Sequence, residues 1–110
     1  MKYEVPIDPD NFNTSQAQII RLVGHNKSIL NIGCASASLD RYFVKNGCRV
    51  VGIEEDIELA KEAQKVCDKV IIGNVEEENT LNQIEGEFEV LILSHILEHL
   101  IDPGRILSKI

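Results

Sequence analysis

The sequence predicts an α/β domain of three layers, in which helices cover a mostly parallel sheet. Short apolar runs alternate with stretches of helical periodicity, and each run is apolar on both faces. Such runs are typical of strands buried between two helical layers. Small or polar residues follow each run. Because ligands of parallel sheets bind beyond the carboxyl ends of the strands, these residues form the candidate site.

Four strands and the helices between them can be placed by pattern. Strands are expected at residues 29–33, 49–54, 69–72 and 88–93, and helices at 14–24, 37–46 and 96–100, with another helix starting at Pro103. A further helix is expected after Asp56, with Ala60, Ala63 and Cys67 on one face. Asp56 is expected to cap this helix. In the helix at 37–46, the spacing of Leu39, Tyr42 and Phe43 predicts the buried face. The polar residues 74–86 are expected to form a loop.

Composition limits the class of protein. The 110 residues suffice for one domain, with 44% hydrophobic residues for a core. No apolar run approaches the roughly 18 residues that cross a bilayer, and the N-terminus lacks an apolar signal core, so we expect a cytoplasmic protein without a membrane partner. The net charge of −7 and the absence of a basic patch argue against nucleic acid. Three widely spaced cysteines predict buried free thiols.

Three strand ends carry residues suited to an adenosine. The first strand leads into a run of small residues, Gly33-Cys34-Ala35-Ser36-Ala37-Ser38, which would let a ligand approach the backbone. Glu54 ends the second strand, at about the spacing from Gly33 at which a carboxylate accepts ribose hydroxyls. Asn74 follows the third, where its amide oxygen could accept from an adenine amino group. Taken singly, each is also consistent with an ordinary turn or an exposed strand end.

Motifs in sequence order resemble those of a known family. They are Ile29-Leu30-Asn31-Ile32-Gly33-Cys34-Ala35-Ser36-Ala37, Val50-Val51-Gly52-Ile53-Glu54, Val70-Ile71-Ile72-Gly73-Asn74-Val75-Glu76 and Glu98-His99-Leu100-Ile101-Asp102-Pro103. Together they resemble the cofactor-binding part of class I S-adenosylmethionine-dependent methyltransferases, and most closely the methyltransferase domains found beside glycosyltransferases. The resemblance implies a Rossmann-like three-layer sandwich of about four strands in the order 3-2-1-4, truncated relative to the seven-stranded family fold.

The resemblance also implies S-adenosylmethionine as cofactor and assigns residues to it. Asn31 and the turn that contains Gly33, Cys34, Ala35 and Ala37 would lie by the methionine moiety. Glu54, with Glu55 beside it, would hold the ribose, and Asn74 and Val75 the adenine. Ser94 and His95 would face the methyl group. No catalytic base is assigned, because methyl transfer depends largely on positioning. No metal is expected, because His95, Glu98 and His99 lack a further ligand.

Three positions depart from the family pattern. Asn31 and Asn74 replace the usual Asp, and Ala37 replaces a usual Gly. Loss of the charge at Asn31 is expected to weaken binding about tenfold, whereas Asn74 should cost little because its partner is neutral. If Ala37 needs a positive φ, it costs about 1–2 kcal/mol. Asn31→Asp together with Ala37→Gly is therefore expected to recover binding.

Two other functions remain open from the sequence. One is a degenerate methyltransferase-like module with a structural or interaction role. The other is a nicotinamide-dinucleotide domain, which is disfavoured because the turn lacks the Gly-x-Gly-x-x-Gly pattern.

Length sets a further expectation. Residues 1–110 are expected to be one domain, and a fragment of a longer chain, since only four of seven strands are present. The chain alone would then be inactive and the methyl acceptor undefined. Residues 88–93 would form an exposed edge strand, open to self-association.

Overall fold

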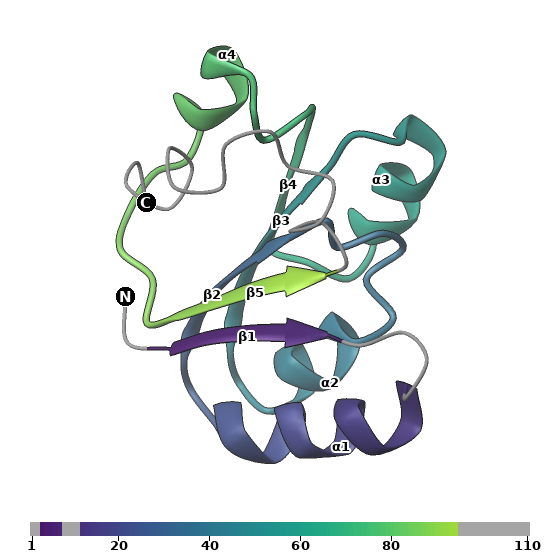
Figure 1. Ribbon diagram of the computed structural model, residues 1–110, viewed down its shortest axis with the longest axis vertical. Helices are drawn as coiled ribbons and strands as arrows, with labels where there is room; N and C mark the ends of the chain where they lie inside the picture. Colours follow the sequence, from purple (N-terminus) through teal and green to yellow (C-terminus); the bar gives the residue numbers. More distant parts are fainter. Residues whose placement is uncertain (1–2, 8–11, 95–110) are drawn as a thin grey trace.

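The centre of the molecule is a five-stranded parallel sheet (Figure 1). The computed structural model describes residues 3–7 and 12–94. The strands are β1 (Tyr3–Ile7), β2 (Ser28–Ile32), β3 (Arg49–Glu54), β4 (Lys69–Ile72) and β5 (Val90–Ser94), and their order across the sheet is β1-β5-β2-β3-β4. All neighbouring pairs run parallel. The carboxyl ends of the strands therefore meet at one edge.

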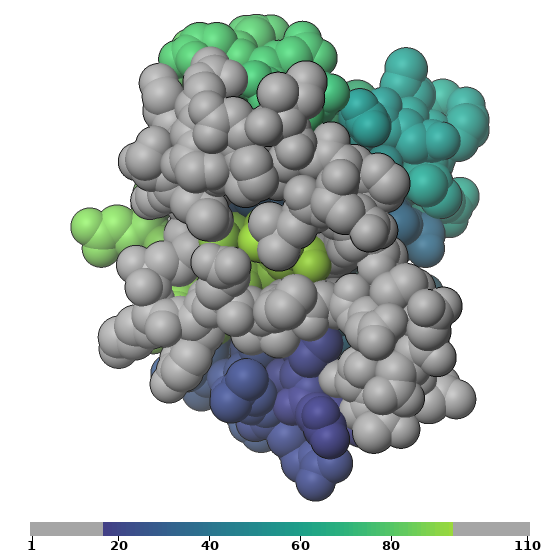
Figure 2. All heavy atoms as spheres, in the orientation of Figure 1, coloured from purple at the N-terminus to yellow at the C-terminus, as the bar shows by residue number. Residues whose placement is uncertain are grey.

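Four helices connect the strands. They are α1 (Phe12–Val23), α2 (Asp40–Lys45), α3 (Ile57–Ala63) and α4 (Glu78–Leu81). Asp56 caps α3 as predicted, because its carboxylate accepts a hydrogen bond from the Leu59 N–H at 3.1 Å. In the space-filling view α1 lies at the base of the molecule and α3 at the upper right (Figure 2).

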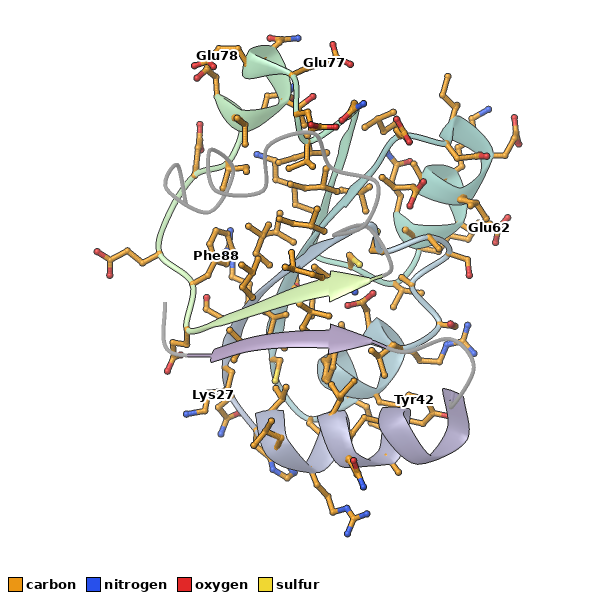
Figure 3. All side chains as sticks on the ribbon, viewed as in Figure 1. Lys27, Tyr42, Glu62, Glu77, Glu78 and Phe88 are labelled. Carbon is orange, nitrogen blue, oxygen red and sulfur yellow. The ribbon has the colours of Figure 1, made fainter. Side chains whose placement is uncertain are left out.

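The sheet has a buried core on each face, and alternate residues of β2 serve different cores. Ile29 packs with α1, α2 and α3 residues that include Ile19, Phe43 and Ala63. Leu30 and Ile32 instead pack in the second core, on the face that also receives α4 and the segment before β5. Phe88 points into this second core, whereas Glu77 and Glu78 point away from the body (Figure 3).

The expected α/β class and the strand order of the four predicted strands are confirmed. Their order 3-2-1-4 corresponds to β4-β3-β2-β5 in the structure. The predicted bounds 49–54 and 69–72 coincide with β3 and β4. The predicted first and fourth strands overlap β2 and β5 and differ from them by one or two residues at the ends.

The exposed edge expected at residues 88–93 is wrong in this structure. Strand β1 pairs with β5 along its length, from Tyr3 opposite Val90 to Ile7 opposite Ser94. The backbone groups that we expected to be open to a second chain are thus engaged within the molecule, and the argument for self-association through this edge loses its premise. Pro6 is compatible with β1 because an edge strand has one unpaired side.

The helices differ from prediction in detail. Helix α2 begins at Asp40 because residues 37–39 still belong to the preceding turn. Its buried residues are Asp40 and Phe43, whereas Tyr42, predicted to be buried, is 47% exposed. The predicted loop 74–86 contains the single-turn helix α4. The helices predicted at 96–100 and from Pro103 lie outside the described residues.

Within residues 3–7 and 12–94, no helix combines the length and the apolar character that a membrane crossing requires.

Candidate functional site

Hydrogen bonds join the ends of three neighbouring strands into one edge. The N–H of Gly33, just after β2, donates to the Ile53 carbonyl of β3 at 2.8 Å. The N–H of Gly73, just after β4, donates to the Glu54 carbonyl at 3.0 Å. The three segments predicted to carry the site therefore lie side by side. Had Glu54 and Asn74 lain away from the Gly33 turn, the predicted site could not exist.

The turn after β2 adopts an unusual backbone conformation. Gly33, Ala35 and Ala37 have φ values of 78°, 53° and 66°. Left-handed conformations cost a residue with a side chain about 1–2 kcal/mol, so the condition under which Ala37 was expected to be strained is met. Ala35 has the same conformation, which the sequence analysis did not anticipate. The Ala37 N–H donates to the Cys34 carbonyl at 2.9 Å and closes the turn.

The Glu54 carboxylate connects this turn to the start of α3. One oxygen, Oε1, accepts from the Ala35 N–H at 2.8 Å, and Oε2 accepts from the Asp56 N–H at 3.0 Å. A carboxylate can accept about four hydrogen bonds, so further acceptor positions remain on both oxygens. The side chain is half-buried and its orientation is fixed from two sides. Glu55 is exposed beside it.

Asn74 and Val75 form the third part of the edge. The Asn74 side-chain oxygen accepts from the Glu76 N–H at 2.9 Å and so holds the local turn. An amide oxygen has two lone pairs, so it can accept one further bond. The Val75 side chain is buried in the second core, which leaves its backbone as the part that can contact a ligand. Gly73 allows close approach, since a Cβ there would collide with the Thr80 hydroxyl of α4.

Comparison with protein families identifies the chain. The family model described as "Methyltransferase domain" matches residues 30–110. The chain belongs to this methyltransferase domain family. No curated protein matches the sequence significantly.

Solved structures share the fold of this methyltransferase domain. A TehB-like SAM-dependent methyltransferase from Corynebacterium glutamicum has a TM-score of 0.68 at 22% identity, and the match covers 86% of this chain and 52% of that protein. An S-adenosylmethionine-dependent methyltransferase from Mesorhizobium loti has a TM-score of 0.69 at 15% identity, and the match covers 84% of this chain and 45% of that protein. Magnesium protoporphyrin IX methyltransferase from Synechocystis, with bound SAM, has a TM-score of 0.65 at 15% identity, and the match covers 87% of this chain and 51% of that protein. The domain thus spans about half the length of these proteins.

Asn31 is buried beneath the edge and is engaged with a residue that the sequence analysis missed. Its Nδ2 donates to both carboxylate oxygens of Asp40, at 2.9 Å each, and both residues are almost fully buried. Burial raises the pKa of Asp40 to about 6, against the lowering effect of the Asn31 hydrogen bond. The spacing between Asp40 and Phe43 could have indicated an inward carboxylate, because residues three apart share a helix face.

The Cys34 side chain packs in the core and does not face the candidate site. Its thiol donates to the Ala35 carbonyl at 3.7 Å. Interaction with the Cys67 thiol, together with burial, raises the pKa of the Cys34 thiol above its usual range. Gly52 lies directly under the two sulfurs, since a Cβ there would be 2.7 Å from the Cys34 Sγ and 3.5 Å from the Cys67 Sγ. Any contact of Cys34 with a ligand would therefore be made by its backbone.

Two predicted residues remain to be placed. Ser94 is the last residue of β5, so its backbone lies at the same edge of the sheet as the ends of β2 and β3. His95, predicted to face the methyl group, lies outside the described residues. Glu98 and His99 lie outside them as well.

Proposed function

We propose that this chain is the donor-binding part of an S-adenosylmethionine-dependent methyltransferase. The observation that carries the proposal is the Glu54 carboxylate, held at the strand edge by the N–H groups of Ala35 and Asp56. A carboxylate fixed in this way with acceptor positions to spare is suited to a vicinal diol such as ribose. Family membership supplies the methyl-transfer chemistry, and a relative of the same fold is described with bound SAM.

The other residues complete the assignment. The backbone of Asn74 and Val75, together with the Asn74 amide, would contact the adenine. The Gly33–Ala37 turn, with its left-handed residues, would bring its backbone close to the methionine moiety. Asn31 supports that turn from beneath. Ser94 and His95 would lie nearest the transferred methyl group.

The chain's own contribution to catalysis is positioning. When bound, S-adenosylmethionine supplies a methyl carbon made electrophilic by its sulfonium sulfur. Glu54 and the Gly33–Ala37 turn would hold the donor so that the acceptor's lone pair approaches in line with the breaking carbon–sulfur bond. Orientation of this kind can account for a large part of a rate enhancement.

The acceptor site is assigned to further parts of the protein. The chain spans about half the length of the structures it resembles, so we infer that this chain binds the donor but is inactive without further strands.

The cytoplasm is the proposed location, supported by three cysteines that are all free and buried.

The test is a titration of the isotopically labelled chain with S-adenosylhomocysteine, followed by amide chemical shifts. We expect the largest shifts at Gly33, Ala35, Glu54 and Asn74. The variant Glu54→Gln should weaken binding about tenfold, because neutral acceptors form weaker hydrogen bonds than charged ones. The matched control is Glu62→Gln, which changes an exposed glutamate of α3 that points to solvent (Figure 3).

Two outcomes would overturn the proposal. An unperturbed spectrum at millimolar ligand would favour a module with no cofactor. Shifts of the same amides with NAD, but not with S-adenosylhomocysteine, would favour a dinucleotide site.

A further inference from the structure

A carboxylate–amide pair is buried directly beneath the candidate donor site. Among the described residues, Asn31, Asp40 and Thr80 are the buried polar or charged side chains. Asn31 and Asp40 contact each other through two bonds of 2.9 Å from Nδ2 to the carboxylate oxygens. Both lie on the face of the sheet that α2 covers, since Asn31 shares the side of Ile29, and Asp40 that of Phe43.

The pair lacks a compensating positive charge among the residues that the structure describes. The ion pairs there join Lys27 to Glu89, Lys61 to Glu58 and Lys65 to Glu62. The turn contributes one titratable group that interacts with Asp40, the Cys34 thiol. The charge of Asp40 raises the pKa of this thiol, as do Cys67 and Glu54. The Asp40 carboxylate is stabilised by the Asn31 amide and by a backbone hydrogen bond rather than by a cation. A buried carboxylate without a paired charge is costly, so its position in the fold needs an explanation.

The Asn31–Asp40 pair lies at the base of the Gly33–Ala37 turn. Asn31 is the fourth of the five residues of β2, and Asp40 is the first residue of α2. Residues 32–39 between them contain the whole Gly33–Ala37 turn. The Asn31–Asp40 contact therefore links the strand that enters the turn to the helix that leaves it. Ala35 and Ala37 are held in left-handed conformations that their side chains disfavour, and a link across the base opposes relaxation of that strain.

We propose that Asp40 is a positioning residue of the donor site, which through Asn31 fixes the Gly33–Ala37 turn in its binding conformation. The identity of the ligand rests on the proposed function, whereas the positioning role of Asp40 rests on its contact with Asn31. It does not require Asp40 to touch the donor.

The proposal reverses an expectation drawn from the sequence. Asn31→Asp was expected to strengthen donor binding by restoring the family's usual charge. In this structure the new carboxylate would lie against that of Asp40, where two buried like charges repel. Asn31→Asp alone should therefore weaken binding, whereas the exchanged pair Asn31→Asp with Asp40→Asn keeps one carboxylate and one amide in contact.

The experiment compares wild type, Asp40→Asn, Asn31→Asp and the exchanged double variant. For each, calorimetry measures the affinity for S-adenosylhomocysteine, hydrogen exchange measures the protection of the Ala35 and Ala37 amides, and thermal unfolding measures stability. The matched control is Asp68→Asn, which alters an exposed aspartate at the opposite end of β3, where its carboxylate accepts from the Val50 N–H at 2.8 Å.

We expect Asp40→Asn and Asn31→Asp each to weaken binding about tenfold and to speed exchange at Ala35 and Ala37 by a similar factor. Asp40→Asn should do so without lowering the melting temperature, because it removes a buried charge. The double variant should return to within about threefold of wild-type affinity, and the control should bind as wild type does.

Wild-type affinity and turn protection in Asp40→Asn would overturn the inference. So would a loss of binding that merely follows a fall in melting temperature, with no rescue by the double variant. If wild type itself fails to bind, the proposed function is wrong. The exchange data then decide the positioning role alone: faster exchange in Asp40→Asn supports it, and unchanged exchange overturns it.

Discussion

Ala35 and Ala37 both have left-handed backbone conformations, but their side chains lie in different surroundings. Ala35 is exposed, whereas Ala37 is fully buried in the core beneath α2. A glycine at either position would relieve strain, but only at Ala37 would it also remove a buried methyl group. The family pattern marks Ala37 as unusual, but the balance between strain and burial at this position is visible only in the structure.

Ala35→Gly should therefore stabilise the protein, and Ala37→Gly should not. Relief of strain is worth about 1–2 kcal/mol, and the greater freedom of glycine in the unfolded chain returns about 0.5–1 kcal/mol of it. The buried methyl of Ala37 contributes about a further 0.8 kcal/mol. Urea denaturation should show a gain in unfolding free energy of about 0.5–1 kcal/mol for Ala35→Gly and a change near zero for Ala37→Gly. Equal gains would contradict this reasoning.

Asp40 gives the stability of the protein a characteristic pH dependence. Its pKa is raised from 3.8 to about 6 in the folded state, mainly by burial. Between these values the folded protein holds a proton that the unfolded chain releases. The contribution of Asp40 to the free energy of unfolding is therefore fully present below pH 3.8 and is lost as the pH rises through about 6. The loss amounts to at most about 3 kcal/mol.

The measurement is the unfolding free energy of wild type minus that of Asp40→Asn, followed from pH 3.5 to pH 8. We expect this difference to fall between about pH 4 and pH 7 and to be level above about pH 7. A difference that rises with pH would mean that Asp40 is stabilised as an anion, contrary to its burial.

At the scale of elements, prediction succeeded where a single pattern determined the structure. Strands β3 and β4 begin and end where their apolar runs do, and Asp56 caps α3 as expected. Helix α2 was predicted to begin three residues too early, because residues 37–39 are compatible with a helix in isolation and are fixed in the turn by the Ala37–Cys34 bond. Asp40 was missed because carboxylates rarely lie in a protein core, and its spacing from Phe43 is only a weak indication of an inward side chain.

The close contact between β3 and the Gly33–Ala37 turn yields a prediction for Gly52. In Gly52→Ala the new Cβ would lie 2.7 Å from the Cys34 Sγ and 3.3 Å from the Cys34 Cβ, so the Cys34 side chain must shift, and we expect the turn to shift with it. We expect a loss of about 1–3 kcal/mol of unfolding free energy and shifted amide resonances at Gly33 and Ala35. Cys34→Ala in the same chain removes the sulfur and should restore part of the loss. Equal stability of the single and double variants would place the strain elsewhere.

On the scale of the whole molecule, the feature that sequence reasoning missed is the pairing of β1 with β5. The segment is five residues long and contains Pro6, so its pattern is too short and too interrupted to indicate a strand. It nevertheless decides whether the sheet ends in an open or a paired edge. The overall class was predictable from the alternation of elements, and the order of the four predicted strands from the family resemblance. The candidate residues that follow β2, β3 and β4 were expected at the carboxyl edge, and the structure brings these strand ends together there.

Removal of residues 1–7 should expose the edge that β1 covers. We expect faster amide exchange along β5 and concentration-dependent dimers in sedimentation experiments, because unpaired strand groups favour pairing with another chain. The intact chain at the same concentration is the control. If the shortened chain stays monomeric and its β5 amides stay protected, then β1 contributes little to the sheet.

Val75 and Cys34 place their side chains in the core while only their backbones lie at the site edge. A saturation-mutagenesis screen scored for donor affinity would therefore misclassify them. Substitutions at either position would act on donor affinity only indirectly, through the yield of folded protein or through a shift of the backbone at the edge. The atoms that would contact the ligand at these two positions belong to the backbone and, apart from the N–H that proline lacks, are common to every amino acid. Tolerance to substitution at these positions is therefore a poor measure of binding.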